Sequence, residues 1–234
     1  KTIKANTIQS PAITGVHVYN NSKVSTIANN QITSPGKYGI CAEKSTARTI
    51  SGNSISKPAN TGIFIYTKRK TGTISDNTIT SGKDKGIAIN SVKCKMTISG
   101  NTIKKCKAYP IYCNPASTSY AITLKKNIIT GNSKKIDGIR ADTGKLILSS
   151  NTISSWRAII LSSKVKGTVY PNTFKKNTYN NVKVNSSYVK TLTVKSLSGK
   201  SKSAKTATLN WKKLSSASGY VVYRSTSKNG SYTK

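Results

Sequence analysis

Hydrophobic and polar residues alternate along this chain in short runs, and the runs recur with a nearly constant period. The phrase Thr-Ile-Ser-Gly-Asn-Thr-Ile returns with small changes, and its central asparagine falls at Asn6, Asn30, Asn53, Asn77, Asn101, Asn127, Asn151 and Asn172. A second phrase, Gly-Ile-x-Ile, follows and begins at Gly15, Gly39, Gly62, Gly86, Pro110, Gly138, Ala158 and Asn181. Because these two phrases recur with nearly the same period, they indicate a repeat architecture.

Each repeat predicts three short strands. One strand ends just before the asparagine, one begins just after it, and the third is the Gly-Ile-x-Ile phrase. Alternation places the isoleucines of each strand on one side. A single repeat cannot bury that apolar side alone, so successive repeats must stack and cover one another. The pattern therefore predicts an all-β parallel solenoid of about eight coils, with isoleucine lying over isoleucine.

The repeated asparagines are interpreted as a structural ladder and not as catalytic groups. The chain must bend between two strands at this point, and asparagine tolerates the left-handed conformation and bonds locally. Stacked side chains could also bond to one another along the axis. These two phrases resemble the right-handed parallel β-helix repeat family, the architecture of pectate lyases and polygalacturonases, over residues 1 to about 185. The resemblance implies fold more strongly than activity, because this fold hosts many functions.

The pattern changes near the C-terminus, and we predict a boundary between a β-helix at 1–188 and a second region at 189–234. A stretch rich in serine and lysine precedes strand-like runs around Trp211, Tyr220 and Tyr232. These runs resemble the first half of a fibronectin type III module, with Trp211 as its core tryptophan. Such modules need about 90–100 residues. The expectation is therefore a linker followed by an incomplete β-sandwich.

The charge of the chain limits the classes of partner that we expect it to bind. It has 39 Lys and Arg residues and 5 Asp and Glu residues, which give a formal net charge of +34. Such a field attracts polyanions and weakens with salt. Candidate partners are acidic polysaccharides, anionic cell-wall polymers, membrane surfaces and nucleic acids. The chain has no membrane-length apolar run and no recognised nucleic-acid motif. We expect a monomeric, secreted or cell-wall-associated protein of bacterial type, seen here as a mature or excised fragment.

The chain contains Cys41, Cys94, Cys106 and Cys113, without a Cys-x-x-Cys pair. Their spacing matches no metal site that we recognise, so buried or free thiols are expected. No metal and no cofactor is predicted, and calcium would be expected only for a lyase.

A candidate ligand-binding surface lies on the outward face of the third strands. Alternation brings the only histidine, two acids and four aromatic side chains to this face. The candidates are His17, Tyr19, Glu43, Phe64, Tyr66, Tyr112 and Asn114. Clustered aromatic and polar groups favour a binding surface, although an aromatic ladder can also simply stabilise a sheet. The flanking turns carry lysines, at Lys68-Arg69-Lys70, Lys93 and Lys95 on one side and Lys83, Lys85, Lys104, Lys105, Lys107, Lys134 and Lys135 on the other.

Catalytic candidates are few. Asp137, Arg140 and Asp142 share one coil and form the best acid–base cluster, although the last two could equally be a surface ion pair. His17 beside Glu43 could be a general base with its orienting partner, or an exposed pair of no consequence.

Two functions follow from these features. The first is an extracellular polysaccharide-binding or adhesive protein that recognises acidic glycans on a basic, aromatic-lined sheet face. The alternative is a β-helix polysaccharide lyase or glycoside hydrolase that acts on an acidic polymer of the pectin type.

Overall fold

The structure is a computed structural model, and it describes residues 1–68, 71–131, 136–175, 177, 182–185, 189–191, 195–203, 206–212, 220 and 222. The chain divides into two compact units, Lys1–Thr191 and Leu192–Lys234. The described residues contain strands and turns but no helix, and so no helix that could cross a membrane.

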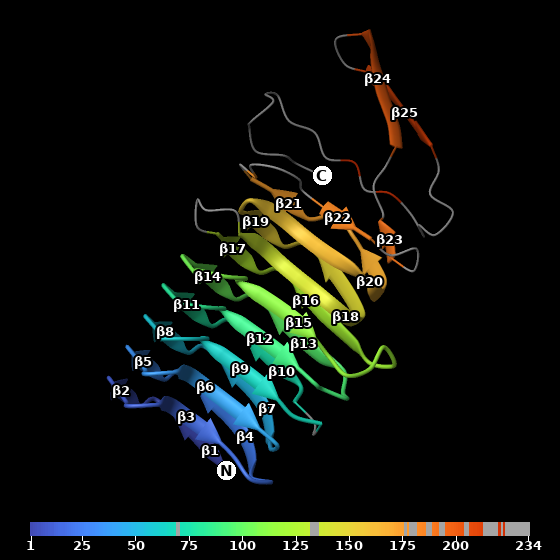
Figure 1. Cartoon of the computed structure of the whole chain (residues 1–234). Coiled ribbons are helices and arrows are strands. Elements are labelled where there is room, and N and C mark those ends of the chain that lie inside the picture. The colour runs from blue at the N-terminus through green and yellow to red at the C-terminus, as the bar shows by residue number, and fades with distance from the viewer. Residues whose placement is uncertain are drawn as a thin grey trace. The chain divides into compact units, whose positions relative to one another are not determined.

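The first unit is a stack of coils (Figure 1). Each coil is built from three strand segments, which pair in parallel with the equivalent segments of the neighbouring coils. The first strands, which precede each asparagine, are β1 (Thr2–Lys4), β4 (Lys23–Ala28), β7 (Thr46–Ser51), β10 (Thr73–Ser75), β13 (Met96–Ser99) and β16 (Ala121–Lys125). The second strands form a separate eight-stranded sheet of β2 (Thr7–Gln9), β5 (Gln31–Thr33), β8 (Ser54–Ser56), β11 (Thr78–Thr80), β14 (Thr102–Lys104), β17 (Ile128–Thr130), β19 (Thr152–Ser154) and β21 (Thr173–Phe174).

The third strands are β3 (Thr14–Val18), β6 (Tyr38–Glu43), β9 (Ile63–Tyr66), β12 (Ile87–Asn90) and β15 (Ile111–Asn114). In the following coils the third strand continues into the next first strand, which produces the long strands β18 (Asp137–Ser149) and β20 (Arg157–Val169). The stack ends with β22 (Val182–Val184) and β23 (Val189–Thr191), which both pair with β20. This arrangement confirms the predicted all-β solenoid.

The register of the strands follows the sequence period. Ile3 pairs with Ile27, and Ile74 lies between Ile50 and Ile98. The same holds for the second and third strands, where Ile79 lies between Ile55 and Ile103 and Ile87 between Ile63 and Ile111. Since a one-residue slip would turn every isoleucine outward, the apolar columns fix this register.

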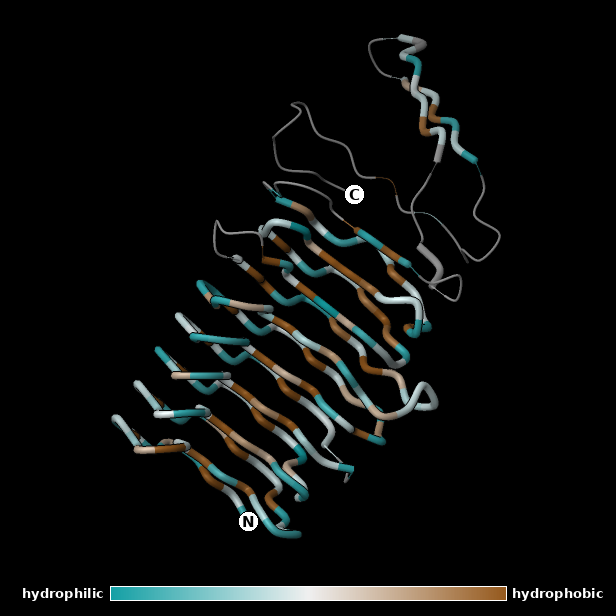
Figure 2. The backbone as a smooth tube through the Cα atoms, viewed as in Figure 1, coloured by the Kyte–Doolittle hydropathy of each residue, from teal (hydrophilic) through white to brown (hydrophobic). Residues whose placement is uncertain are grey.

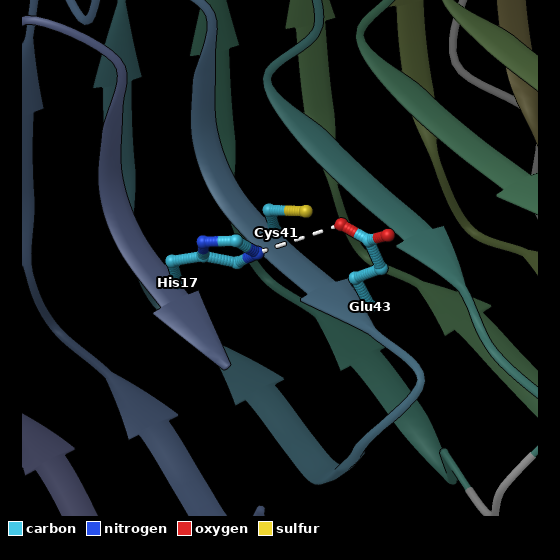
Figure 3. Close-up of side chains that lie close together, drawn as sticks. All are labelled: His17, Cys41 and Glu43. Atoms are coloured by element: carbon cyan, nitrogen blue, oxygen red, sulfur yellow. Dashed lines mark ion pairs between the residues drawn. The ribbon is translucent and has the colours of Figure 1, made fainter. Parts of the chain in front are cut away.

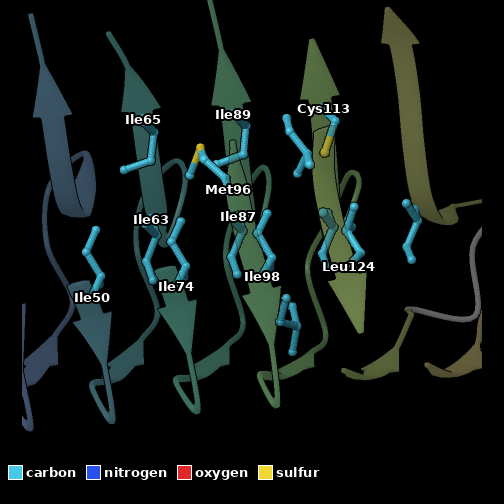
Figure 4. Close-up of a cluster of buried hydrophobic side chains, with 14 of the residues drawn as sticks. Ile50, Ile63, Ile65, Ile74, Ile87, Ile89, Met96, Ile98, Cys113 and Leu124 are labelled. Atoms are coloured by element: carbon cyan, nitrogen blue, oxygen red, sulfur yellow. The ribbon is translucent and has the colours of Figure 1, made fainter. Parts of the chain in front are cut away.

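The core lies inside the coils, where the columns meet. Figure 4 shows isoleucine side chains of successive coils stacked beside one another, and Ile74, Ile87 and Ile98 are completely buried. Figure 2 shows the alternation along each strand that produces this core. Burying one such side chain stabilises the fold by about 1.5–3 kcal/mol. The terminal residues Ile3 and Ile8 are only partly buried.

The asparagine ladder has a different backbone geometry from the one expected. The left-handed conformation belongs to the residue before the asparagine, as at Asn29, Gly52 and Gly100, which have φ of 54°, 64° and 66°. The ladder asparagines themselves are not in that region. The sequence interpretation was therefore wrong on this point, because the preceding residue makes the bend and leaves the asparagine free to bond along the stack.

The bonds of the ladder run from each coil to the next. The N–H and the side-chain amide of Asn77 both donate to Oδ1 of Asn101, at 3.0 and 2.9 Å. Asn101 donates in the same way to Asn127, and its amide also donates to the carbonyl of Ile74 at 3.0 Å. Equivalent bonds join every successive pair from Asn6 to Asn172. The buried amides are thereby satisfied, as a polar column in a core requires.

In the described part of the second unit, β24 (Lys195–Ser203) and β25 (Thr206–Lys212) form an antiparallel pair. The Trp211 ring lies edge-on to Tyr220, with centroids 5.2 Å apart. Most of the later residues on which the fibronectin-like resemblance rests lie outside the described residues. That resemblance, and the boundary between 188 and 189, remain predictions.

Candidate functional site

The candidate site is the outward face of the third-strand sheet. The pairing places His17 beside Cys41, Cys41 beside Phe64, and Phe64 beside Ala88. The row continues through Tyr112 to Arg140. A second row runs from Glu43 through Tyr66 and Asn90 to Asn114. The structure therefore brings the sequence candidates of this face into two adjacent lines that follow the solenoid axis.

Aromatic rings gather at the N-terminal end of this face. The ring of Phe64 stacks on Tyr38 at 4.8 Å between centroids and lies 6.3 Å from Tyr66. Tyr19 lies 5.3 Å from the imidazole of His17. Tyr19 and Tyr66 are 50% and 39% exposed. In a ladder that only stabilises the sheet, the rings would cover one another. Tyr19 and Tyr66 instead expose ring surface that a ligand can contact.

Two adjoining hollows, together called the groove, lie beside Tyr66 where the third strands end and the turns begin. One hollow of about 380 Å³ is lined by Asn21, Lys44, Tyr66, Thr67, Lys68 and Ser91. A second hollow of about 280 Å³ continues from Ser91 and is lined by Asn114, Pro115, Ala116, Ser117, Thr118, Thr143 and Gly144. Since these residues come from six successive coils, the groove extends over roughly 24 Å at the strand spacing. The sequence analysis identified Tyr66, Asn114 and Lys68 but missed turn residues such as Asn21, Lys44 and Ser91, which alternation along the strands does not place.

The left-handed turn residues shape the groove. Asn21, Lys44 and Ser91 all have positive φ, between 48° and 63°. Each follows the end of a third strand, in the first, second and fourth coils. The signal in the sequence is the polar residue two or three positions after the Gly-Ile-x-Ile phrase in these coils. Arg69, Lys70, Lys134 and Lys135, predicted as part of the basic rim, lie outside the described residues.

A second cluster occupies the C-terminal part of the face. The hydroxyl of Tyr112 donates to Oδ2 of Asp142 at 2.8 Å, and Nε of Arg140 donates to Oδ1 at 3.0 Å. Arg140 also donates to the hydroxyl of Tyr109 at 3.1 Å, and its guanidinium lies 5.1 Å from that ring. Lys85 lies 5.5 Å from the Tyr112 ring and pairs with Asp84 at 2.7 Å. The carboxylate of Asp142 is thus occupied by two donors.

This network changes how Tyr112 responds to pH. Burial, and then the bond to Asp142, raise the pKa of Tyr112 from 10.0 to about 12. Because the folded state holds this proton more tightly, the resulting stability is complete below about pH 10 and is lost as pH rises through about 12. We expect Tyr112→Phe to reduce the fall in unfolding free energy across this window. The measurement is denaturant unfolding at several alkaline pH values, with the exposed Tyr120→Phe as control. The same slope in both variants would contradict the expectation.

The three catalytic candidates do not converge. Both oxygens of Asp137 accept hydrogen bonds from Arg157, at 2.7 and 3.2 Å, and its side chain is 3% exposed. Asp137 and Arg140 are three positions apart in β18, so their side chains point to opposite faces. Only Arg140 and Asp142 remain together, as a half-exposed ion pair.

One group on this face adds a third residue to the pair His17 and Glu43 that the sequence analysis identified. Nε2 of His17 lies 3.8 Å from Oε2 of Glu43. The thiol of Cys41 completes this group, and one ligand atom from each residue lies within 4.8 Å of the others. Cys41 was interpreted only as a buried or free thiol. The signal was the distance of one repeat between His17 and Cys41, followed by the spacing Cys-x-Glu.

Comparison with known proteins adds one finding. A family model described as a right handed beta helix region matches residues 1–153. No curated protein and no solved structure matches the chain.

Proposed function

The chain belongs to the family of right-handed β-helix proteins, and from this premise we propose that it is an extracellular module that binds acidic polysaccharide. The ligand lies along the groove beside Tyr66, with its axis parallel to the solenoid. Adhesion to a matrix or a cell wall that contains such a polymer is the role that follows from this binding.

The observation that carries the proposal is the continuity of the groove. The two hollows share Ser91 and together follow six coils. A site for a small molecule is normally a single enclosed pocket, whereas these two adjoining hollows are open and together span six coils. Such a shape fits an extended polymer that makes the same kind of contact in every coil.

The side chains that line the groove match the chemistry of an acidic glycan. Tyr66 offers an exposed aromatic surface, and Lys44 and Lys68 offer positive charge in the same hollow. Asn114 and Ser117 offer hydrogen-bonding groups further along. The net charge of +34 attracts a polyanion from a distance, and the groove supplies the short-range contacts.

The alternative function, a lyase or hydrolase, receives less support. Glycosidic hydrolysis usually needs two carboxyl groups, placed either about 5 Å or about 6.5–9.5 Å apart. Asp137 is held by Arg157, Asp142 by Arg140 and Tyr112, and Glu43 lies 3.8 Å from His17. A free carboxylate pair is thus not found among the candidates that the sequence identified.

The test measures binding to polygalacturonate, which carries carboxylates, and to a teichoic acid, which carries phosphates, with dextran as the neutral polymer. We expect binding to at least one acidic polymer, no binding to dextran, and weaker binding at higher salt. Tyr66→Ala should weaken binding about tenfold, or about 1.4 kcal/mol. The double variant Lys44→Glu and Lys68→Glu should weaken it further.

A matched control separates groove contacts from overall charge. Lys4 and Lys125 are exposed and lie at equivalent register positions of the first strands, away from the residues that line the groove. Their replacement by glutamate changes the net charge by the same amount as the groove variant. We expect this control to bind nearly as well as the wild type. Equal losses in both double variants would contradict a groove site, and new unsaturated or reducing ends in the polymer would favour the enzyme.

A further inference from the structure

Three residues with different ligand atoms meet on β3 and β6. His17 and Cys41 are direct partners across the two strands, and Glu43 follows Cys41 by two residues on the same face. Figure 3 shows the imidazole and the carboxylate pointing toward each other, with the sulfur of Cys41 beside them. The strands therefore hold the Cα atoms of all three residues in fixed positions.

The distances are close to those that a tetrahedral metal requires. Zinc bonds of about 2.0–2.3 Å place neighbouring ligand atoms roughly 3.3–3.7 Å apart. The three ligand atoms here lie within 4.8 Å of one another, so they must approach by about 1 Å. The side chains of His17 and Glu43 are 42% and 34% exposed, which leaves them free to rotate toward the sulfur.

We propose that His17, Cys41 and Glu43 form a binding site for a divalent transition metal of the zinc class. Sulfur and imidazole nitrogen favour such a metal over calcium or magnesium, which prefer oxygen ligands. With three protein ligands, a fourth position remains for water or for an oxygen of a bound molecule. This site is independent of the polysaccharide proposal and is tested without any glycan.

Binding is an exchange of a proton for the metal. The S–H bond of Cys41 breaks, the proton passes to solvent, and a sulfur–metal bond forms. His17 binds through Nε2 as the neutral imidazole, and Glu43 through one carboxylate oxygen. No oxidation or reduction takes part.

The positive charge of the protein opposes this binding only weakly. At physiological salt, charges more than about 8 Å apart are largely screened. Thiolate and carboxylate together contribute two negative charges directly to the ion. Cys41 itself is 1% exposed, because the neighbouring side chains cover it. The metal must therefore approach from the side of His17 and Glu43.

Cobalt(II) tests the site, because a thiolate–cobalt bond produces a near-ultraviolet charge-transfer band. The complete chain, without a histidine tag, is titrated with Co²⁺, and Zn²⁺ is then added. We expect one ion per chain, a charge-transfer band, and displacement by Zn²⁺ but not by Ca²⁺. His17→Ala should weaken Co²⁺ binding about 100-fold. Loss of an outer-shell partner of a metal ligand already costs up to about 100-fold in affinity, and His17 is itself a ligand.

Variants at the thiols distinguish this site from any other. Cys41→Ser and Cys41→Ala should both lose the band, and circular dichroism shows whether each variant is folded. Cys94→Ser is the control, because Cys94 is the most exposed of the four thiols, at 8%. Loss of the band in Cys94→Ser, or its persistence in folded Cys41→Ala, would overturn the proposal. So would a cobalt spectrum without a thiolate band in the wild type.

Discussion

Replacing Asn101 with alanine should lower the free energy of unfolding by about 3–6 kcal/mol, since an unsatisfied buried polar group costs about 1–3 kcal/mol. Asn101 is completely buried. Its Oδ1 accepts bonds from the N–H and the side-chain amide of Asn77, and its own amide donates to the carbonyl of Ile74. Alanine removes these bonds, and also the bonds from the Asn101 amide to the carbonyl of Ser99 and to Oδ1 of Asn127. Denaturant unfolding followed by circular dichroism measures the loss.

The matched control is at the start of the same ladder. Asn6 is exposed, and its amide donates to Oδ1 of Asn30 and to the carbonyl of Lys4. Oδ1 of Asn30 keeps the bond from the N–H of Asn6 when the side chain is removed. Asn6→Ala should therefore cost only about 1 kcal/mol, the value of an ordinary hydrogen bond. Similar losses at both positions would show that burial does not govern the strength of the ladder.

Replacing Arg157 with alanine should destabilise the protein by about 3–5 kcal/mol, the usual cost of breaking a buried ion pair by removing one partner. Asp137 and Arg157 are register partners on β18 and β20. Two hydrogen bonds join them, and the side chain of Asp137 is 3% exposed. The variant leaves this carboxylate buried without its guanidinium. Thermal or denaturant unfolding of the purified variant gives the magnitude.

A double-mutant cycle shows whether the loss comes from this pair. The additional change Asp137→Asn removes the stranded charge, so the double variant should recover part of the stability. Arg140 and Asp142 provide the comparison, because they form an ion pair on the same strand with side chains 35% and 33% exposed. That pair should contribute at most about 1 kcal/mol. Comparable coupling energies for the two pairs would contradict a structural role specific to Asp137.

The two ends of the third-strand face differ in how much exposed side-chain surface they offer to a ligand. At the C-terminal end, Tyr112, Arg140 and Asp142 bond to one another. At the N-terminal end, Tyr19 and Tyr66 remain substantially exposed, and the groove begins there. Binding at this end is therefore compatible with a rigid sheet, because the cluster around Arg140 stabilises the other half of the face.

The repeat period in the sequence determined most of the fold. In a solenoid, the neighbour of each residue lies one repeat away, so Ile74 meets Ile50 and Ile98, and Asn77 meets Asn101. Contacts between residues that are distant in the sequence can therefore be predicted from the spacing of similar residues. The same rule places His17, Glu43 and Tyr66 on one outward face.

Only the tertiary structure decided what those outward residues do. The rule gives the face and the row of a side chain, but not its rotamer or the path of the turns. The partner of Asp137 is Arg157, the groove is formed by turn residues such as Ser91, and Cys41 lies with His17 and Glu43. Each of these three arrangements depends on side-chain conformations and turn paths that do not repeat from coil to coil. A periodic sequence pattern carries no information about such departures from the repeat.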